Sequence, residues 1–152
     1  MRKFMLSVLV SLAALFLFSA AANGEILISE VMASNGVYKD GEAYDWLELH
    51  NTGDKAVDLS GCYLSNSRKN PLKWAFPEGA RIKAGGYLLV YCTGEELAPG
   101  KSPYYANFKI SASGTSLLLT ARDGETALTA LAVPPQYGAV SWGLPSGGGD
   151  YA

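Results

Sequence analysis

The chain has 152 residues, with 12 Lys and Arg against 14 Asp and Glu, so its formal net charge at pH 7 is −2 with the single histidine neutral. A chain of this length has enough residues for one domain with a single buried core. The slightly acidic balance lacks the basic footprint that phosphate backbones select, so we do not expect nucleic acid as a partner.

The first 22 residues have the features of a secretory signal peptide. Arg2 and Lys3 precede an uncharged apolar run of about 15 residues, which ends in the small residues Ser19-Ala20-Ala21-Ala22. A membrane-spanning helix needs roughly 20 apolar residues, so we expect this segment to be removed, leaving no stable membrane span. Cleavage is expected after Ala22, with a cut after Gly24 as the alternative. The processed chain, with 10 basic and 14 acidic residues and a net charge of −4, is then secreted or displayed at the cell surface.

Beyond residue 25 the apolar residues form short alternating runs closed by Gly, Asn, Asp or Pro, which predicts strands rather than helices. In chain order, the expected strands lie at 26–31, 44–50, 57–59, 62–64, 74–76, around 82, 87–92, 117–122, 125–133 and 140–142. The run 87–92 is apolar on both faces, as a central strand is. Residues 93–105 hold recurrent Gly and Pro and are expected to form a long surface loop. Asp123-Gly124 predicts a two-residue hairpin turn, because both positions of that turn require positive φ.

The number and spacing of these runs predict an all-β domain of two packed antiparallel sheets. The residues expected to face the space between the sheets form the predicted core. They are Ile28, Val31, Leu47, Leu49, Leu59, Leu64, Trp74, Phe76, Leu88, Val90, Phe108, Leu117 and Leu119.

The sequence offers little for catalysis. A serine or cysteine nucleophile needs a base in reach, and His50 is the only histidine. No nucleophile elbow and no phosphate-cradling glycine loop is present. One histidine with two distant cysteines does not meet the spacing of a zinc site, so we expect no enzyme activity and no cofactor.

Four carboxylates lie within nine residues, at Asp40, Glu42, Asp45 and Glu48. Asp45 and Glu48 are three apart, so on a strand they point to opposite faces and cannot both address one site. We interpret Asp45 as an anchor that accepts hydrogen bonds from loop N–H groups, and Glu48 as solvated or paired with a strand neighbour. Metal ligation and acid–base work are the alternatives.

Six aromatic residues could form a platform that stacks on sugar rings, or they could fill and border the core. They are Trp74, Tyr87, Tyr91, Tyr104, Tyr105 and Trp142. Trp46 shares its strand face with Glu48 and His50, so it is either packed under the loop at 36–42 or partly exposed.

Five motifs, taken in order, resemble the bacterial lamin tail domain family. They are Ile28-Ser29-Glu30-Val31, Ala33-Ser34-Asn35, Asp45-Trp46-Leu47-Glu48-Leu49-His50-Asn51, Val57-Asp58-Leu59-Ser60-Gly61 with Tyr63-Leu64-Ser65, and Ala84-Gly85-Gly86-Tyr87. The segment 106–114 is similar to the same family. The resemblance implies an immunoglobulin-like antiparallel β-sandwich over residues 25–143, used as an accessory or interaction module without a catalytic centre.

The resemblance also implies a secreted or cell-surface interaction or scaffold module, whose partner is an envelope or extracellular protein or polymer. Asn35, Asp45, Trp46 and Glu48 are then candidate loop-anchoring or ligand-contact residues. Two alternatives stay open: a carbohydrate-binding module, or the accessory domain of a longer surface protein of the CotH, nuclease or phosphatase type. Residues 144–152 are expected to be a flexible tail or a truncated continuation.

Cys62 and Cys92 could form one disulfide in an oxidising compartment, or they could be two small buried apolar residues. Spacing alone cannot decide this, because a disulfide needs a short Cα–Cα distance. Relatives usually have a bulky residue where Cys62 stands, and Cys92 lies on a strand that could neighbour it. The resemblance therefore favours the disulfide.

Overall fold

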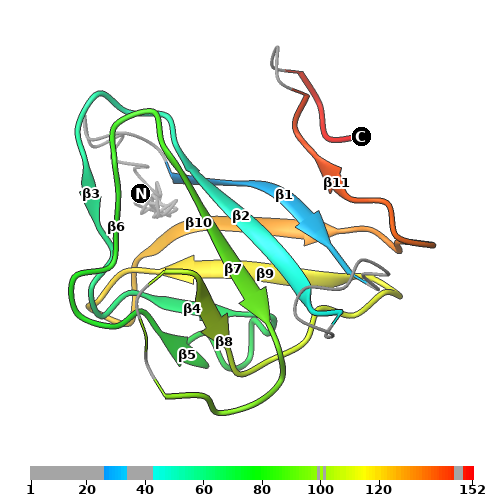
Figure 1. The fold of residues 1–152 in the computed structure, drawn as a ribbon, viewed down its shortest axis with the longest axis horizontal. Coiled ribbons are helices and arrows are strands. Elements are labelled where there is room, and N and C mark those ends of the chain that lie inside the picture. The colour runs from blue at the N-terminus through cyan, green and yellow to red at the C-terminus, as the bar shows by residue number, and fades with distance from the viewer. Residues whose placement is uncertain (1–25, 34–42, 99, 101, 146–148) are drawn as a thin grey trace, which may run out of the picture.

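A computed structural model describes residues 26–33, 43–98, 100, 102–145 and 149–152, and Figure 1 shows that these residues form strands and connecting turns. The strands are β1 Ile26–Met32, β2 Asp45–Asn51, β3 Val57–Asp58, β4 Tyr63–Ser65, β5 Trp74–Ala75, β6 Arg81–Ile82, β7 Tyr87–Cys92, β8 Tyr104–Ala106, β9 Thr115–Thr120, β10 Ala127–Val133 and β11 Trp142–Gly143. The predicted signal peptide and the predicted ligand contact Asn35 lie outside the described residues.

Two sheets pack face to face, which confirms the predicted all-β, immunoglobulin-like sandwich (Figure 1). The larger sheet has the strand order β11-β1-β2-β7-β8, and the smaller sheet has the order β10-β9-β4-β5. Strands β3 and β6 form a separate two-stranded ladder. β7 is central in the larger sheet, as its two apolar faces predict. The expected long loop ends earlier than predicted, because Tyr104–Ala106 pairs with β7 in the one parallel ladder among the described strands.

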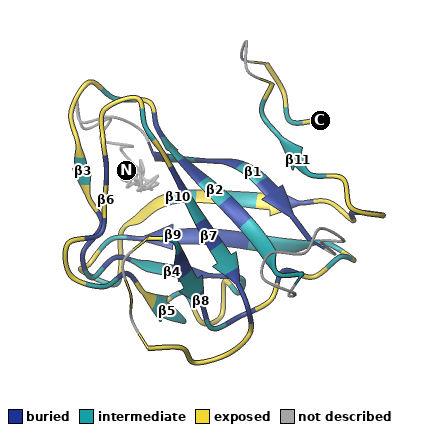
Figure 2. Cartoon of the chain, viewed as in Figure 1, coloured by how far each residue is buried: buried dark blue, intermediate teal, exposed yellow. Residues whose placement is uncertain are grey.

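The core lies between the two larger sheets, and every predicted core residue but one is buried there. Trp74 is the exception: it is half-buried and packs against the core from β5. Figure 2 shows the buried residues concentrated along β1, β7 and β9, whereas the turns and much of β10 are exposed. Phe76 and Tyr104 place their rings 5.7 Å apart in an edge-on contact, so aromatic packing joins the two sheets near β5 and β8.

A β-bulge at Ser29 decides which residues of β1 face the core. The register passes from Ile28↔Leu49 directly to Glu30↔Glu48, which leaves Ser29 as the extra residue. Strict alternation from Ile28 would turn Glu30 inward. The extra residue reverses the alternation instead, so that Val31 is fully buried while Glu30 faces outward on the sheet.

Asn51 is a buried hydrogen-bonding centre at the end of β2. Its side chain is 0% exposed. Its Nδ2 donates to the carbonyl oxygens of Lys55 at 2.7 Å and Lys83 at 3.0 Å. Nδ2 also contacts the Ile82 carbonyl at 3.3 Å, and Oδ1 accepts from the Gly53 N–H at 3.0 Å. One amide therefore ties the turn after β2 to the end of β6.

The predicted β9–β10 hairpin is confirmed, but its turn is longer than predicted. The Ala121 N–H donates to the Thr126 carbonyl at 2.8 Å, and this bond encloses a turn of four residues, 122–125, rather than two. Gly124 has φ 76°, and its N–H donates to the Ala121 carbonyl at 2.9 Å. Asp123 accepts from the backbone N–H groups of Glu125 and Thr126, each at 2.9 Å. The Asp side chain thus closes a wider turn than the Asp-Gly pair predicts.

Two exposed carboxylates, Asp58 and Asp123, make the stability of the fold depend on pH. Hydrogen bonds from the Ser60 hydroxyl and N–H lower the pKa of Asp58, and those from Thr126 lower the pKa of Asp123. The unfolded chain therefore takes up these protons at a higher pH than the folded chain. We expect the free energy of unfolding to be constant near neutral pH and to decrease as the pH falls below about 4.

Urea titrations between neutral and acidic pH measure this effect. The double variant Asp58→Asn/Asp123→Asn should lose less stability on acidification than the unaltered protein. An equal loss in both proteins would assign the acid sensitivity to other carboxylates.

The described residues 142–145 and 149–152 contact β1 and one another. The last strand is β11 Trp142–Gly143, shifted from the predicted 140–142, and it pairs with β1. Ala152 exchanges two backbone hydrogen bonds with Gly143, at 3.0 and 3.1 Å. The Tyr151 ring stacks on Trp142 at 4.6 Å, and its hydroxyl donates to the Ile28 carbonyl at 2.6 Å. The described residues 149–152 therefore lie back against β11 and the edge of β1.

Candidate functional site

The outward side of the larger sheet, which we call the outer face, holds the candidate site. Alternation along β2 buries Leu47 and Leu49 and turns Trp46, Glu48 and His50 away from the core. The cross-strand register then aligns the outward residues of β2, β7 and β8 in rows. These rows are His50↔Tyr87, Glu48↔Leu89 and Trp46↔Tyr91↔Tyr105.

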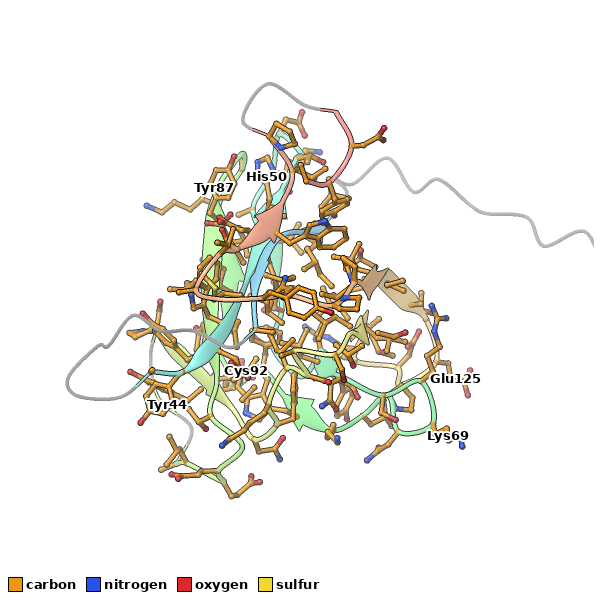
Figure 3. The ribbon with its side chains drawn as sticks, turned by 90° about the vertical axis from the view of Figure 1, so that its right-hand side faces the viewer. Tyr44, His50, Lys69, Tyr87, Cys92 and Glu125 are labelled. Carbon is orange, nitrogen blue, oxygen red and sulfur yellow. The ribbon has the colours of Figure 1, made fainter. Side chains whose placement is uncertain are left out.

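A groove of about 480 Å³ lies at one end of the outer face. Its lining residues come from β1, β2, the start of β7 and the segment after β11. They are Leu27, Ser29, Glu30, Glu48, His50, Thr52, Tyr87, Leu144 and Pro145. Figure 3 shows Tyr87 and His50 side by side at this end of the sheet, close to the C-terminal segment. Their rings are stacked 4.1 Å apart and nearly parallel, and Tyr87 is 60% exposed.

Two glutamates face each other across the groove floor, because Glu30 on β1 is the cross-strand partner of Glu48 on β2. Each carboxylate accepts a hydrogen bond from a hydroxyl through Oε1. Glu48 accepts from Ser29 at 2.7 Å, and Glu30 accepts from Ser141 in a short bond. The bulge at Ser29 creates both features, since it turns Glu30 outward and brings the Ser29 hydroxyl to Glu48.

A tyrosine cluster, formed by Tyr44, Tyr91 and Tyr105, occupies the other end of the outer face. Tyr91 and Tyr105 are stacked with their centroids 5.5 Å apart. The Tyr44 ring meets both of them edge-on, at 6.2 and 6.3 Å. Figure 3 shows Tyr44 at the end of the sheet opposite Tyr87. All three residues are only partly buried, so part of each side chain lies at the surface.

The predicted site residues of β2, Asp45, Trp46 and Glu48, do not lie together in one site. Asp45 Oδ2 accepts from the Ile110 N–H at 3.0 Å, which ties the loop after β8 to the start of β2. Glu48 lies in the groove and bonds a strand neighbour, whereas half-buried Trp46 is aligned with the tyrosine cluster. A smaller pocket of about 170 Å³ lies beside Asp45 and Cys92.

The disulfide that the sequence favoured is not formed, since Cys62 and Cys92 are both free, buried thiols. The two thiols have different neighbours: Cys92 at the end of β7 is paired with Asp45 and Ala106, whereas Cys62 before β4 lies near Arg122 and Asp58. Desolvation raises the pKa of both thiols, most strongly that of Cys92. The alternative of two small buried apolar residues describes them correctly.

The six aromatic residues proposed as a sugar platform do not act as one set. Tyr104 is buried, and Trp74 packs against the core. Trp142 is stacked with Tyr151. Tyr87, Tyr91 and Tyr105 remain on the outer face. Glu30 and Tyr44 were missed as site residues, although the odd spacing between Ile28 and Val31 already indicates an irregularity that re-aims Glu30.

Comparison with known families identifies the chain. The family model described as Lamin Tail Domain matches residues 19–133, which is more than half of the 152 residues. The chain belongs to the lamin tail domain family. This is a family of non-enzymatic, immunoglobulin-like domains. A search of curated proteins finds no match to the chain.

The family match includes one end of the candidate site completely and the other end only in part. It ends at Val133, the last residue of β10, so the lamin tail domain match includes the tyrosine cluster and the glutamates. Leu144, Pro145 and Ser141, which complete the groove, lie outside the match. The C-terminal wall of the groove is therefore an addition to the matched domain.

Two further observations bear on chemistry at the site. Within the described residues, no three His, Cys, Asp or Glu side chains come together as a metal-binding group. The same part of this lamin tail domain has no helix of the length and apolar character needed to cross a membrane.

Proposed function

We propose that this lamin tail domain is a non-catalytic interaction module, secreted or displayed at the cell surface, which binds an envelope or extracellular protein through its outer face. The observation that carries the proposal is the row of Trp46, Tyr91 and Tyr105, which lie in register on three neighbouring strands and are each only partly buried. Aromatic residues that leave polar tips at a surface are enriched where proteins bind one another.

The groove chemistry supports a binding role over a catalytic one. The buried Ser29 hydroxyl donates to the Glu48 side chain rather than to the His50 ring. The His50 ring is stacked against Tyr87. A nucleophile activated by histidine needs the two side chains within hydrogen-bond reach, and this arrangement provides a binding surface instead.

Carbohydrate binding is the second candidate function, and one observation favours it. The stacked Tyr91–Tyr105 pair with Trp46 beside it presents adjacent rings to the outside of a β-sandwich. Such rings can stack on sugar faces. The acidic groove at the other end adds nothing that a neutral polysaccharide requires.

The proposal is tested by capture from an envelope fraction with the purified protein as bait. We expect the double variant Tyr91→Ala/Tyr105→Ala to lose the captured protein. Tyr137→Ala is the matched control, because Tyr137 is 83% exposed and lies in the connection after β10. Loss with the first variant but not with the control supports binding through the outer face.

A panel of neutral polysaccharides, tested with the same variants, separates the two candidate functions. Glycan binding that requires Tyr91 and Tyr105, without any captured protein, would overturn the protein-interaction proposal. Equal capture by the double variant and the unaltered protein would also overturn it. Recovery of the chain only from the cytoplasm would remove the proposed location.

A further inference from the structure

The groove on the outer face has the chemistry of a site for positive charge. We propose that it binds a lysine or arginine side chain of an extended segment presented by the protein partner. This inference rests on the proposed function and adds to it the chemical class of the ligand. It is argued from the pairing of Glu30 with Glu48, the stacked His50 and Tyr87 rings, and the wall after β11.

The paired carboxylates are the first step. Glu30 and Glu48 are direct cross-strand partners, and like charges in that position destabilise a sheet. Each carboxylate receives one hydroxyl donor, from Ser141 and Ser29, and both donors are neutral. A neutral donor leaves the negative charge in place. A cation between the two carboxylates would replace the repulsion by two attractions.

The second step is the lack of a compensating cation within the site. Among the described residues that line the groove, none is a lysine or an arginine. In the described part of the chain, the one ion pair joins Arg122 to Asp58, and neither residue lines the groove. The described lining of the groove therefore supplies no cation to pair with these carboxylates.

The remaining lining residues suit the rest of a basic side chain. Tyr87 and His50 form a stacked aromatic surface beside the carboxylates, and aromatic faces attract ammonium and guanidinium groups. Leu27, Leu144 and Pro145 supply apolar surface. The methylene stem of lysine or arginine packs on such surface while its charged end reaches a polar group.

The segment after β11 holds one wall of the groove in position. Gly143 is paired with Glu30, and a Cβ built on it would lie 2.8 Å from the Ser29 carbonyl oxygen and 2.9 Å from Glu30 Cγ. Any larger residue must move β11 away from β1. Leu144 and Pro145 would move with it, so Gly143 is a positioning residue for the site.

A short peptide of alternating lysine and serine is the probe, and its affinity is measured by fluorescence anisotropy at low and at physiological ionic strength. Glu30→Gln/Glu48→Gln keeps both hydroxyl acceptors and removes both charges. We expect about a tenfold or greater loss of affinity in this variant, with most of the salt dependence removed. Tyr87→Ala should weaken binding by a smaller factor.

The control is Glu78→Gln/Glu125→Gln, which removes the same charge from two exposed positions outside the groove. Figure 3 shows Glu125 on the side of the molecule away from Tyr87. Equal weakening by both double variants would mean general attraction to an acidic protein and would overturn the inference. Preference for an acidic peptide of the same length would overturn it as well.

Gly143→Ala tests the C-terminal wall, with Gly100→Ala as its control because a Cβ there meets nothing within 4 Å. We expect only the first substitution to weaken peptide binding, and unchanged affinity would remove the wall from the site. Circular dichroism and urea midpoints confirm that each variant is folded. Envelope capture that depends on Tyr91 and Tyr105 but not on the glutamates would refute this inference and leave the proposed function intact.

Discussion

Asn51→Ala is expected to lower the free energy of unfolding by about 2–4 kcal/mol, because it removes the hydrogen bonds that this fully buried amide makes to the backbone of the turn after β2 and of the end of β6. The carbonyl of Lys55 loses its 2.7 Å bond, and the Gly53 N–H loses its acceptor. The Lys83 carbonyl still accepts from the Gly86 N–H at 2.9 Å, so the loss of stability is smaller than the loss of three complete hydrogen bonds would cause. Urea unfolding followed by tryptophan fluorescence measures the change.

Asn51→Asp sharpens this prediction, because it preserves the shape of the side chain and replaces the donor with an acceptor. A carboxylate would then face the carbonyl oxygens of Lys55 and Lys83, so at neutral pH this variant should be less stable than Asn51→Ala. Burial among acceptors disfavours the charged form and raises the pKa of the new carboxyl in the folded state. Its stability should therefore improve as the pH falls toward about 4, whereas that of the unaltered protein is expected to stay constant over this range. If Asn51→Ala proved less stable than Asn51→Asp at neutral pH, the volume of the side chain would matter more than its hydrogen-bond donors.

Phe76→Ala is expected to cost about 3–5 kcal/mol, the largest loss from any single core truncation in this fold. Phe76 is 2% exposed, and its ring meets Trp74 at 4.7 Å and Tyr104 at 5.7 Å. The three rings join β5 to β8, so the cavity would open between the two sheets and could not be closed by one strand alone. Phe76→Leu retains most of the volume and should cost less.

Leu97→Ala is the matched control for this truncation, since Leu97 is 41% exposed and lies in the surface loop before β8. We expect it to change the free energy of unfolding by less than about 0.5 kcal/mol. Similar losses for Phe76→Ala and Leu97→Ala would contradict the assignment of Phe76 to the joint between the sheets.

The sandwich could be predicted because burial on one face of a strand leaves a period of two in the sequence. Leu47 and Leu49 follow that period, as do Leu88 and Val90, and all four are buried. Parallel pairing has no such local signature. Tyr104–Ala106 is short and joins β7 only because the chain returns after a long loop, so β8 was missed.

The site was predicted less well than the fold, for reasons that its residues explain. Glu48 was placed correctly because strand alternation determines its face. Glu30 depends on a bulge, which strict alternation cannot anticipate, and the groove wall depends on the pairing of Gly143 with a strand more than 100 residues earlier. The Asp-Gly turn was misjudged because the Asp123 side chain bonds two N–H groups and stabilises a wider turn.

Burial makes the two cysteine thiols unreactive in the folded protein, whereas unfolding makes them reactive. Cys62 and Cys92 are 4% and 1% exposed, and burial raises the pKa of both above the usual range of cysteine. The thiolate is the nucleophile that attacks alkylating reagents and disulfides, so we expect neither sulfur to react while the sheets stay closed. In an oxidising environment this protects the chain from cross-linking to other thiols. The rate at which each cysteine is alkylated therefore measures how often the two sheets separate.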